Sequence, residues 1–494
     1  IQIAAVGRQN DHLNANPEMT LFKSQHKRYT NFAEDFEEND FSAGTVGFGQ
    51  RVSANVSRYG DLVSDVLLEV TLPAIQASDV VMNGAGTEVA AADKAAYWVN
   101  AVGYAIISEV EIEIGGTEVD TLYSEWMFLW EELTQKPGAR LSEQIGKFAF
   151  SADVEEDMIE FASQERKLYV PLPFWFNKYW MENGLSIPLI ALTYHEIKIK
   201  VSFRPLADCC AVVFRETDST FGDYWALAAD KIPVNSASGS ALAASDMDAR
   251  LLVSYVYLDQ EERQAFASVQ HEYLITTVQR QMHSITSASA KSDQIKLYFN
   301  HPSNALVWLV RPTDFKNLRR RFSVGHKDMF DFSLKKEDAT IGVWGDVTDS
   351  VASASLTLNG HSRFPDNLPG IFFRQVQPAL KWPNTPAGYT YLFTFAALGG
   401  VWNPTSTLNM SRIDHVQLEL KYGANIPTSD VIVFNEAYNL LVVKDGMGGE
   451  VKDPVVGILD ASNRVSWGRE APFLSCGMTQ ERYSSPGVLG WLVC

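Results

Sequence analysis

The chain has 494 residues and carries 41 Lys and Arg against 60 Asp and Glu, which gives a formal net charge of −19 at pH 7. Hydrophobic residues make up 46% of the chain, a share that excludes extended disorder and predicts a folded globular protein. The longest uncharged apolar run, near residues 187–194, is far shorter than the roughly 20 residues that span a bilayer, and the sequence opens without a signal-peptide pattern.

Strands dominate the first 200 residues. Three stretches alternate apolar and polar side chains with a period of two, the pattern of a strand with one buried face: residues 62–72, 110–114 and 197–203. Gly115 and Gly116 follow the second stretch and predict a hairpin turn. This half of the chain is therefore expected to form antiparallel sheet.

Helices are few. The clearest is expected before Pro137, where apolar residues recur at helical spacing: Leu122, Trp126, Leu129, Trp130 and Leu133. Two shorter helices are expected at residues 154–161 and after Asp259, whose distance along the chain to Glu262 is that of a capping box.

The middle of the chain interrupts the strand pattern. Residues 206–250 lose the alternation and include a small, polar stretch at 235–245, so they are expected to form a loop or linker. The second half alternates again at residues 416–422, and Asn359-Gly360 predicts another hairpin. Its other strands read as buried on both faces: residues 251–258, 306–310 and 431–434. Two strand-rich blocks predict two sandwich or barrel domains of similar architecture.

Enzyme motifs are missing from the sequence. It contains no phosphate-binding loop, dinucleotide-binding glycine motif, nucleophile elbow or zinc-binding histidine pair, and its nine histidines are scattered. We therefore predict no catalytic, cofactor-binding or metal-binding residue. The acidic clusters at residues 34–40 and 153–160 could hold a cation or an acid/base pair, but such runs are more typical of a solvated face. The aromatic group at residues 174–180 is either a sugar-binding platform or, as its apolar surroundings favour, part of the core.

The remaining chemical signals are weak. Four cysteines are too few for a disulfide scaffold, and the adjacent Cys209 and Cys210 are poorly placed to bridge each other, which favours thiols in a reducing compartment. The negative charge disfavours nucleic-acid binding, although one basic group lies near the N-terminus: Lys23, His26, Lys27 and Arg28. Asn55 and Asn409 each open a formal glycosylation sequon, a tripeptide that is common by chance.

A series of short motifs runs through the chain in a fixed order between residues 10 and 449. In the first block they lie at residues 14–23, 27–32, 47–53, 57–62, 110–116, 170–176 and 189–196. In the second block they lie at residues 255–258, 262–263, 271–275, 299–302, 358–361, 363–364, 411–414 and 446–449. One motif alone is weak, but the ordered series resembles the major capsid proteins of nucleocytoplasmic large DNA viruses, with algal-virus members nearest in character.

This resemblance implies an all-β fold of two consecutive eight-stranded antiparallel jelly rolls with a few short helices in loops. The divisions expected are an N-terminal arm at 1–35, a first jelly roll at 36–205, a linker at 206–250, a second jelly roll at 251–449 and a C-terminal extension at 450–494. Family members usually end soon after the glycine turn at 446–449. The extension is thus a departure, interpreted either as an arm that reaches a neighbour or the underlying membrane layer, or as a segment folded back on the second roll.

The resemblance also implies a structural role without catalysis or cofactors. Homotrimers would form pseudo-hexagonal capsomers that tile the outer shell of an icosahedral virion assembled in the host cytoplasm. The implied partners are neighbouring capsomers, with minor capsid and penton proteins on the inner face, an internal membrane nearby, glycans, and no direct contact with the genome. The alternatives are a minor virion β-sandwich protein, such as a spike, penton or glycan-binding component, and a carbohydrate-active enzyme with two carboxylates in a cleft.

Overall fold

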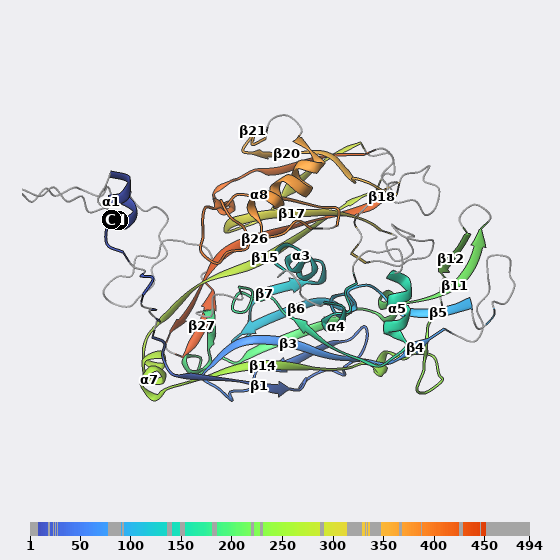
Figure 1. Cartoon of the computed structure of the whole chain (residues 1–494), viewed down its shortest axis with the longest axis horizontal. Coiled ribbons are helices and arrows are strands. Elements are labelled where there is room, and N and C mark those ends of the chain that lie inside the picture. The colour runs from blue at the N-terminus through green and yellow to red at the C-terminus, as the bar shows by residue number, and fades with distance from the viewer. Residues whose placement is uncertain are drawn as a thin grey trace, which may run out of the picture. The chain divides into compact units, whose positions relative to one another are not determined.

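The computed structural model describes most of the chain before residue 451, and its elements are shown in Figure 1. The residues described are 8–17, 20–22, 24, 26, 28–77, 90, 93–135, 141–148, 154–179, 185–218, 222–227, 231–286, 291–313, 329–330, 332, 334–335, 347–364, 368–386, 388–423, 428–444 and 446–450.

The first sandwich consists of two antiparallel sheets around an apolar core. One sheet has the order β1 (Phe32–Asn39), β14 (Asp248–Leu258), β3 (Leu62–Leu72) and β8 (Arg166–Pro171), with β9 (Ile187–Pro188) beside β3. The other has the order β2 (Arg51–Asn55), β10 (Ile197–Phe203), β6 (Ile107–Ile114) and β7 (Thr117–Tyr123). The strands predicted at 62–72, 110–114 and 197–203 are confirmed as β3, β6 and β10, because alternate residues of each strand are buried in the core.

Two smaller sheets use residues that were expected to form a linker. One has the order β12 (Gly222–Leu227), β11 (Cys210–Asp218) and β5 (Lys94–Trp98), and the other pairs β13 (Val234–Asn235) with β4 (Ile75–Gln76). The prediction of a linker over 206–250 therefore fails for residues 210–218 and 222–227, which form strands, whereas the polar stretch at 235–245 is mostly turn and loop. Residues 210–214 of β11 are buried without interruption, so this part of the strand has no solvent-exposed face and leaves no alternation in the sequence.

The second sandwich repeats the two-sheet arrangement. Its inner sheet has the order β15 (His271–Ile285), β26 (Ser429–Lys444), β17 (Pro302–Pro312) and β23 (Thr390–Thr394), with β24 (Leu408–Asn409) beside β17 and β27 (Met447–Glu450) beside β26. Its outer sheet has the order β16 (Ser292–Leu297), β25 (Val416–Tyr422), β20 (Val351–Leu358) and β21 (His361–Ser362), with β22 (Leu368–Pro369) beside β20. The short strands β18 (Leu334–Lys335) and β19 (Val347–Thr348) pair with each other.

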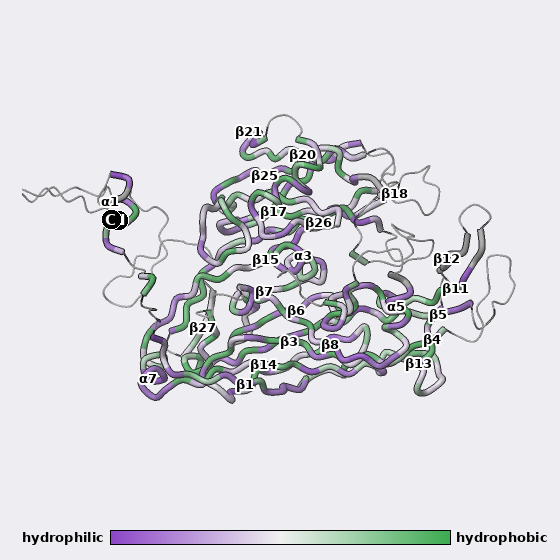
Figure 2. The backbone as a smooth tube through the Cα atoms, viewed as in Figure 1, coloured by the Kyte–Doolittle hydropathy of each residue, from purple (hydrophilic) through white to green (hydrophobic). Residues whose placement is uncertain are grey.

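Two strands of the inner sheet, β17 and β26, are buried on both faces. On β17, Ala305, Val307 and Leu309 belong to the core of the first sandwich, whereas Leu306, Trp308 and Val310 belong to that of the second. On β26, Ile432 and Phe434 likewise alternate with Val431 and Val433 between the two cores. Hydrophobic residues therefore follow one another on these strands, as the sequence predicted, whereas other strands alternate (Figure 2).

The helices are short. They are α1 (Arg8–Asn14), α2 (Val102–Ala105), α3 (Ser124–Thr134), α4 (Leu141–Gln144), α5 (Val154–Ala162), α6 (Leu206–Cys209), α7 (Gln260–Ser268) and α8 (Gln377–Lys381). The 3₁₀ segments are η3 (Leu189–Ala191), η4 (Ala244–Asp246) and η6 (Met410–Arg412), and η5 (Phe372–Val376) is a π-helix that leads into α8. Among the described residues, none of the helices combines the length and the apolar character that crossing a membrane requires.

The predicted turns and helices are confirmed with small shifts. Gly115-Gly116 joins β6 to β7 and Asn359-Gly360 joins β20 to β21, with positive φ at all four residues, as two-residue hairpins require. The predicted helices correspond to α3, α5 and α7, although Leu122 lies on β7 and α3 begins two residues later. The Asp259 side chain accepts a hydrogen bond from the backbone N–H of Gln260 at the beginning of α7.

The sheets divide the chain at positions other than those expected. Strand β14 pairs with β1 and β3, so residues 248–258 complete the first sandwich instead of opening the second. Strand β1 begins at Phe32, inside the segment expected to be an N-terminal arm. We therefore propose a first sandwich over residues 32–258 and a second over 271–450, joined by α7.

Candidate functional site: the seam between the two sandwiches

Helix α3 lies between the first sandwich and the inner sheet (Figure 1). Nine of its 11 residues are buried, which makes it a core helix and not a surface helix. Its aromatic rings pack on the second sandwich, with Trp126 at 5.7 Å from Phe434 and Phe128 stacked at 4.3 Å on Phe330, measured between ring centroids. We call the region formed by α3, β7, β15, β17 and β26 the seam.

A buried carboxylate joins three elements in the seam. Glu125 on α3 is 2% exposed, and its Oε1 accepts hydrogen bonds from Arg204 Nη2 at 3.0 Å and from Arg311 Nη1 at 2.5 Å. Arg204 follows β10 of the first sandwich, whereas Arg311 lies on β17 of the second. Burial alone would raise the pKa of Glu125, but the two guanidinium groups outweigh it and lower this pKa to about 2. Glu125 is therefore a carboxylate that holds the two sandwiches together.

A second ion pair is buried even more deeply. Lys178 of the first sandwich forms an ion pair with Glu436 on β26, and the two side chains are 2% and 0% exposed. The other carboxylate oxygen of Glu436 accepts a hydrogen bond of 2.8 Å from Asn304 Nδ2, and Lys178 Nζ lies 3.8 Å from the centre of the Trp130 ring. Removal of either partner would leave a buried charge, which typically costs about 3–5 kcal/mol.

The edges of two sheets also meet in the seam. Asp120 on β7 accepts a hydrogen bond of 3.0 Å from the backbone N–H of Val278 on β15. Beside it, the guanidinium of Arg280 lies 3.8 Å from the centre of the Tyr123 ring. Unpaired backbone groups on a sheet edge invite pairing with another chain, so these contacts close part of the edge of β15 within the molecule.

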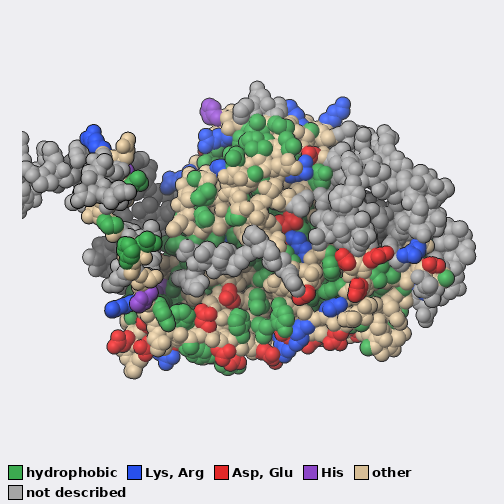
Figure 3. Space-filling view, viewed as in Figure 1, with side chains coloured by type: hydrophobic (Ala, Val, Ile, Leu, Met, Phe, Trp, Pro, Cys, Tyr) green, Lys and Arg blue, Asp and Glu red, His purple; other side chains and the backbone are tan. Residues whose placement is uncertain are grey.

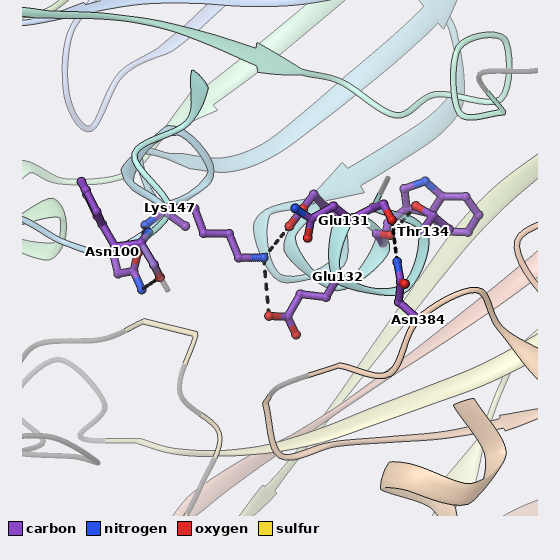
Figure 4. Close-up of polar contacts among 10 residues, drawn as sticks. Asn100, Glu131, Glu132, Thr134, Lys147 and Asn384 are labelled. Carbon is purple, nitrogen blue, oxygen red and sulfur yellow. Dashed lines mark hydrogen bonds and ion pairs between the residues drawn. The ribbon is translucent and has the colours of Figure 1, made fainter. Parts of the chain in front are cut away.

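The C-terminal end of α3 is held by polar side chains, drawn in Figure 4. Lys147 forms ion pairs with Glu131 and with Glu132, the latter at 3.4 Å. Asn384 of the second sandwich donates a 2.6 Å hydrogen bond from Nδ2 to the backbone oxygen of Gln135. The backbone N–H of Asn384 donates a second hydrogen bond, of 3.1 Å, to the backbone oxygen of Leu133. These bonds satisfy carbonyl groups that a helix end leaves without partners.

The glycine turn before residue 450 binds the first sandwich. The backbone N–H of Tyr194 donates to the oxygen of Gly446 at 3.0 Å, and Gly448 N–H donates to His195 Nδ1 at 3.1 Å. A Cβ placed on Gly115 would lie 2.3 Å from the same His195 nitrogen, so this ring is confined between a hairpin of the first sandwich and the glycine turn. The turn has a packing role that the motif alone did not reveal.

The residues singled out from the sequence lie apart from one another. Asn55 is exposed at the end of β2, and Asn409 is half-buried on β24, where its side chain accepts a hydrogen bond from Ser411 N–H. The aromatic group at 174–179 is buried, which confirms the core interpretation for this part, whereas Trp180 lies outside the described residues. Cys209 and Cys210 are buried thiols that contact backbone carbonyl oxygens, and Cys476 and Cys494 lie outside the described residues.

The charged clusters are largely solvated where they are described. Residues 34–38 are exposed on β1, and Glu156, Asp157 and Glu160 are exposed on α5, as a solvated face predicts. Of the basic group, His26 and Arg28 are exposed, whereas Lys23 and Lys27 lie outside the described residues. Within the described ranges, no group of three His, Cys, Asp or Glu side chains is arranged to hold a metal ion.

The charges in the seam were not predicted from the sequence, although a signal for them was present. Each lies inside or next to an apolar or aromatic run: Glu125, Lys178, Arg311 and Glu436. A charge among residues that are buried on every side must be paired, and this rule would have marked all four.

When the chain is compared with known proteins, both sandwiches match families of viral major capsid proteins. Residues 20–259 match the family described as "Major capsid protein N-terminus", and residues 262–449 match the family described as "Large eukaryotic DNA virus major capsid protein". The chain is 31% identical over 474 residues to the major capsid protein of Pyramimonas orientalis virus and 30% identical over 482 residues to that of Paramecium bursaria Chlorella virus 1. Each comparison covers 91% of this chain and 98% of the relative.

Solved structures agree in fold. A chain of the quasi-atomic model of the PBCV-1 virus capsid superposes with a TM-score of 0.65 at 25% identity, over 88% of this chain and 100% of that one. The Faustovirus major capsid protein gives a TM-score of 0.64 at 14% identity, over 89% and 94% of the two chains, and supports the fold alone.

Proposed function

Because this chain belongs to the family of large eukaryotic DNA virus major capsid proteins, a double jelly-roll structural protein of the virion capsid and not an enzyme, we propose that three copies assemble into a pseudo-hexagonal capsomer. Each copy would contribute its two jelly rolls as adjacent corners of the hexagon. Capsomers of this kind would then tile the outer shell.

The seam is the observation that carries this proposal. A hexagonal outline built from three chains requires the two rolls of each chain to keep one mutual orientation. The pairs Glu125–Arg311 and Lys178–Glu436 are buried ion pairs between the rolls. Such pairs lose most of their stabilising energy when the two rolls shift relative to each other. Strands β17 and β26 of the inner sheet, whose residues alternate between the two cores, add an apolar contact between the rolls.

We infer that the contact between copies in the trimer uses the apolar side chains of η5 and α8. Ile371, Val376 and Leu380 are 48%, 40% and 68% exposed there, although a monomer gains nothing from exposing them together. The contacts between capsomers would be polar and modest, because the chain is strongly acidic and a shell is stabilised by many weak contacts. Protonation of carboxylates at low pH would weaken the repulsion between neighbouring capsomers.

Membership of this family also suggests further partners for the capsomer. We propose that minor capsid and penton proteins bind the inner face, that residues 450–494 reach a neighbour or an internal membrane, and that assembly takes place in the host cytoplasm. Asn55 is the more accessible of the two glycan acceptors, since Asn409 is half-buried. The net charge of −19 argues against direct contact with the genome.

The mass of the purified protein in solution tests the trimer. Light scattering on a sizing column should give three times 55.0 kDa, which is about 165 kDa. The double variant Val376→Asp/Leu380→Asp should give a folded monomer. The control variant Tyr298→Asp, at a position that is 78% exposed just after β16 of the same sandwich, should leave the trimer intact. A monomeric parent protein would contradict self-assembly, and a trimeric double variant would contradict the proposed contact.

A further inference from the structure

Strand β1 has one open edge. It pairs with β14 from Phe32–Leu258 to Asn39–Leu251, and no described strand pairs with its other side. Phe32 and Phe36 on this strand are 46% and 53% exposed. An edge strand that exposes aromatic side chains offers both backbone hydrogen bonds and apolar contact to an added segment.

The charge of β1 limits which segment can bind. Glu34, Asp35, Glu37 and Glu38 place four carboxylates within five residues, and acidic side chains gather over the face that contains β1, β14 and β3 (Figure 3). Two β1 strands from two copies therefore repel each other. A basic segment is attracted to the same edge.

A pocket at the beginning of β1 has matching chemistry. Its volume is ≈ 330 Å³, with Phe32, Leu62 and Phe176 among its apolar lining and Glu34, Asp65 and Asn177 among its polar lining. Burial, and then the charge of Glu34, raise the pKa of Asp65, and the Asn177 side-chain oxygen has no hydrogen-bond partner among the described residues. A lysine or arginine would place its hydrocarbon stem against the apolar wall and its cationic head among these oxygens.

The N-terminal segment of the chain has the complementary composition. Residues 1–31 contain Arg8, Lys23, Lys27 and Arg28 against Asp11 and Glu18, a net charge of +2 in a chain of −19. Its apolar side chains are largely exposed where they are described, since Leu21, Phe22 and Tyr29 are 91%, 94% and 85% exposed. Twelve extended residues, from 20 to 31, reach about 40 Å.

We propose that the N-terminal segment of a second copy binds along the open edge of β1 and places a basic side chain in the pocket. The segment of the same copy continues directly into β1 at Phe32, so it could lie along that edge only after a tight reversal at Thr30 and Asn31. A segment from a second copy has no such constraint. This inference rests on the proposed self-assembly and names one surface that the assembly uses.

Cross-linking of isotopically mixed copies tests it. Protein assembled from equal amounts of ¹⁴N and ¹⁵N chains is treated with a carbodiimide, which joins lysines to carboxylates in direct contact, and is analysed by mass spectrometry. We expect Lys23 or Lys27 joined to Glu34, Asp35 or Glu37, with half of these products carrying mixed isotopes. Products of a single isotope type would assign the contact to one chain and overturn the proposal.

Charge reversal gives an independent measurement. Reversal of the segment (Lys23→Glu/Lys27→Glu/Arg28→Glu) or of the strand (Glu34→Lys/Asp35→Lys/Glu37→Lys) should weaken association between copies at least tenfold, and the two reversals combined should restore it. The control reversal Glu156→Lys/Glu160→Lys/Asp414→Lys changes the net charge as much as the reversal of the strand does, at exposed positions on α5 and after η6, and should leave these cross-links in place. If a 165 kDa species forms but gives no such cross-links and does not respond to charge reversal, this inference is overturned and the proposed trimer is still supported. A monomeric parent protein would overturn both.

Discussion

Arg311 Nη1 of the second sandwich lies 2.5 Å from Glu125 Oε1 of the first, in a site from which solvent is nearly excluded. The contact joins a helix of one sandwich to a strand of the other, 186 residues apart in the chain. Because a buried charge requires its partner, the pair makes the orientation of the sandwiches a condition of stability.

Arg311→Met should therefore destabilise the protein by about 3–5 kcal/mol, since it leaves Glu125 with Arg204 alone. The matched control is Arg51→Met, which removes an ion pair with Glu111 in which the arginine is 54% exposed and should cost less than about 1 kcal/mol. Urea unfolding at neutral pH measures both. Equal losses for the two variants would show that the seam pair contributes no more than a surface pair.

The pH dependence of stability should report on Glu125. Its pKa is lowered on folding from 4.5 to about 2, so the native state binds the proton less well than the unfolded state does. The stabilisation, about 3 kcal/mol, is present above pH 4.5 and is lost as the pH falls from there to about 2. Glu125→Gln should be less stable than the parent at pH 7, and the difference should shrink by pH 2.5. A difference that stays constant over this range would contradict the assignment.

Asp120 should protect one backbone amide on β15. Asp120→Ala removes the acceptor of the Val278 N–H, so hydrogen exchange at Val278 should accelerate roughly tenfold, which corresponds to a hydrogen bond worth about 1.4 kcal/mol. Asp120→Asn keeps a side-chain oxygen at the same place and should retain most of the protection. Unchanged exchange in the alanine variant would mean that the amide is protected by other contacts.

Two adjacent glycines offer a test of the glycine turn. Gly115 and Gly116 have φ of +60° and +81°, so alanine is strained at both by a similar amount. A Cβ on Gly115 would lie 2.3 Å from His195 Nδ1, whereas one on Gly116 meets nothing within 4 Å. Gly115→Ala should therefore lower the melting temperature further, by an additional cost of about 1–3 kcal/mol, and should speed exchange of the Gly448 amide. Similar melting temperatures would show that His195 moves aside freely.

The strands that could be predicted from the sequence are those with one solvent-exposed face, because the alternation of apolar and polar residues is visible in the linear sequence. Strands β3, β6, β10 and β25 were found in this way, and so were the two-residue hairpins at Gly115-Gly116 and Asn359-Gly360. Strand β11 was missed because residues 210–214 are buried throughout. Strand β1 was missed for the opposite reason, since residues 32–38 are exposed on both faces.

The partners in the seam depend on contacts that no local pattern contains. Lys178 and Glu436 are 258 residues apart, and each is a single charge in an apolar or aromatic run. Their burial could be inferred from those runs, but their pairing depends on how the two sandwiches pack. The boundary between the sandwiches was misplaced for a similar reason, because the sequence of β14 is equally compatible with either neighbour.

The position of β14 has a consequence for synthesis of the chain. The side chains of Asn39 on β1 and Tyr255 on β14 are hydrogen-bonded although they lie 216 positions apart in the chain, and β14 is the strand that separates β1 from β3. While the ribosome is translating residues 40–247, β1 lacks β14, its partner among the described strands, and β3 lacks one of its own partners. The first sandwich can close only after β14 has left the exit tunnel, so a nascent chain needs protection from pairing with other chains until that strand emerges.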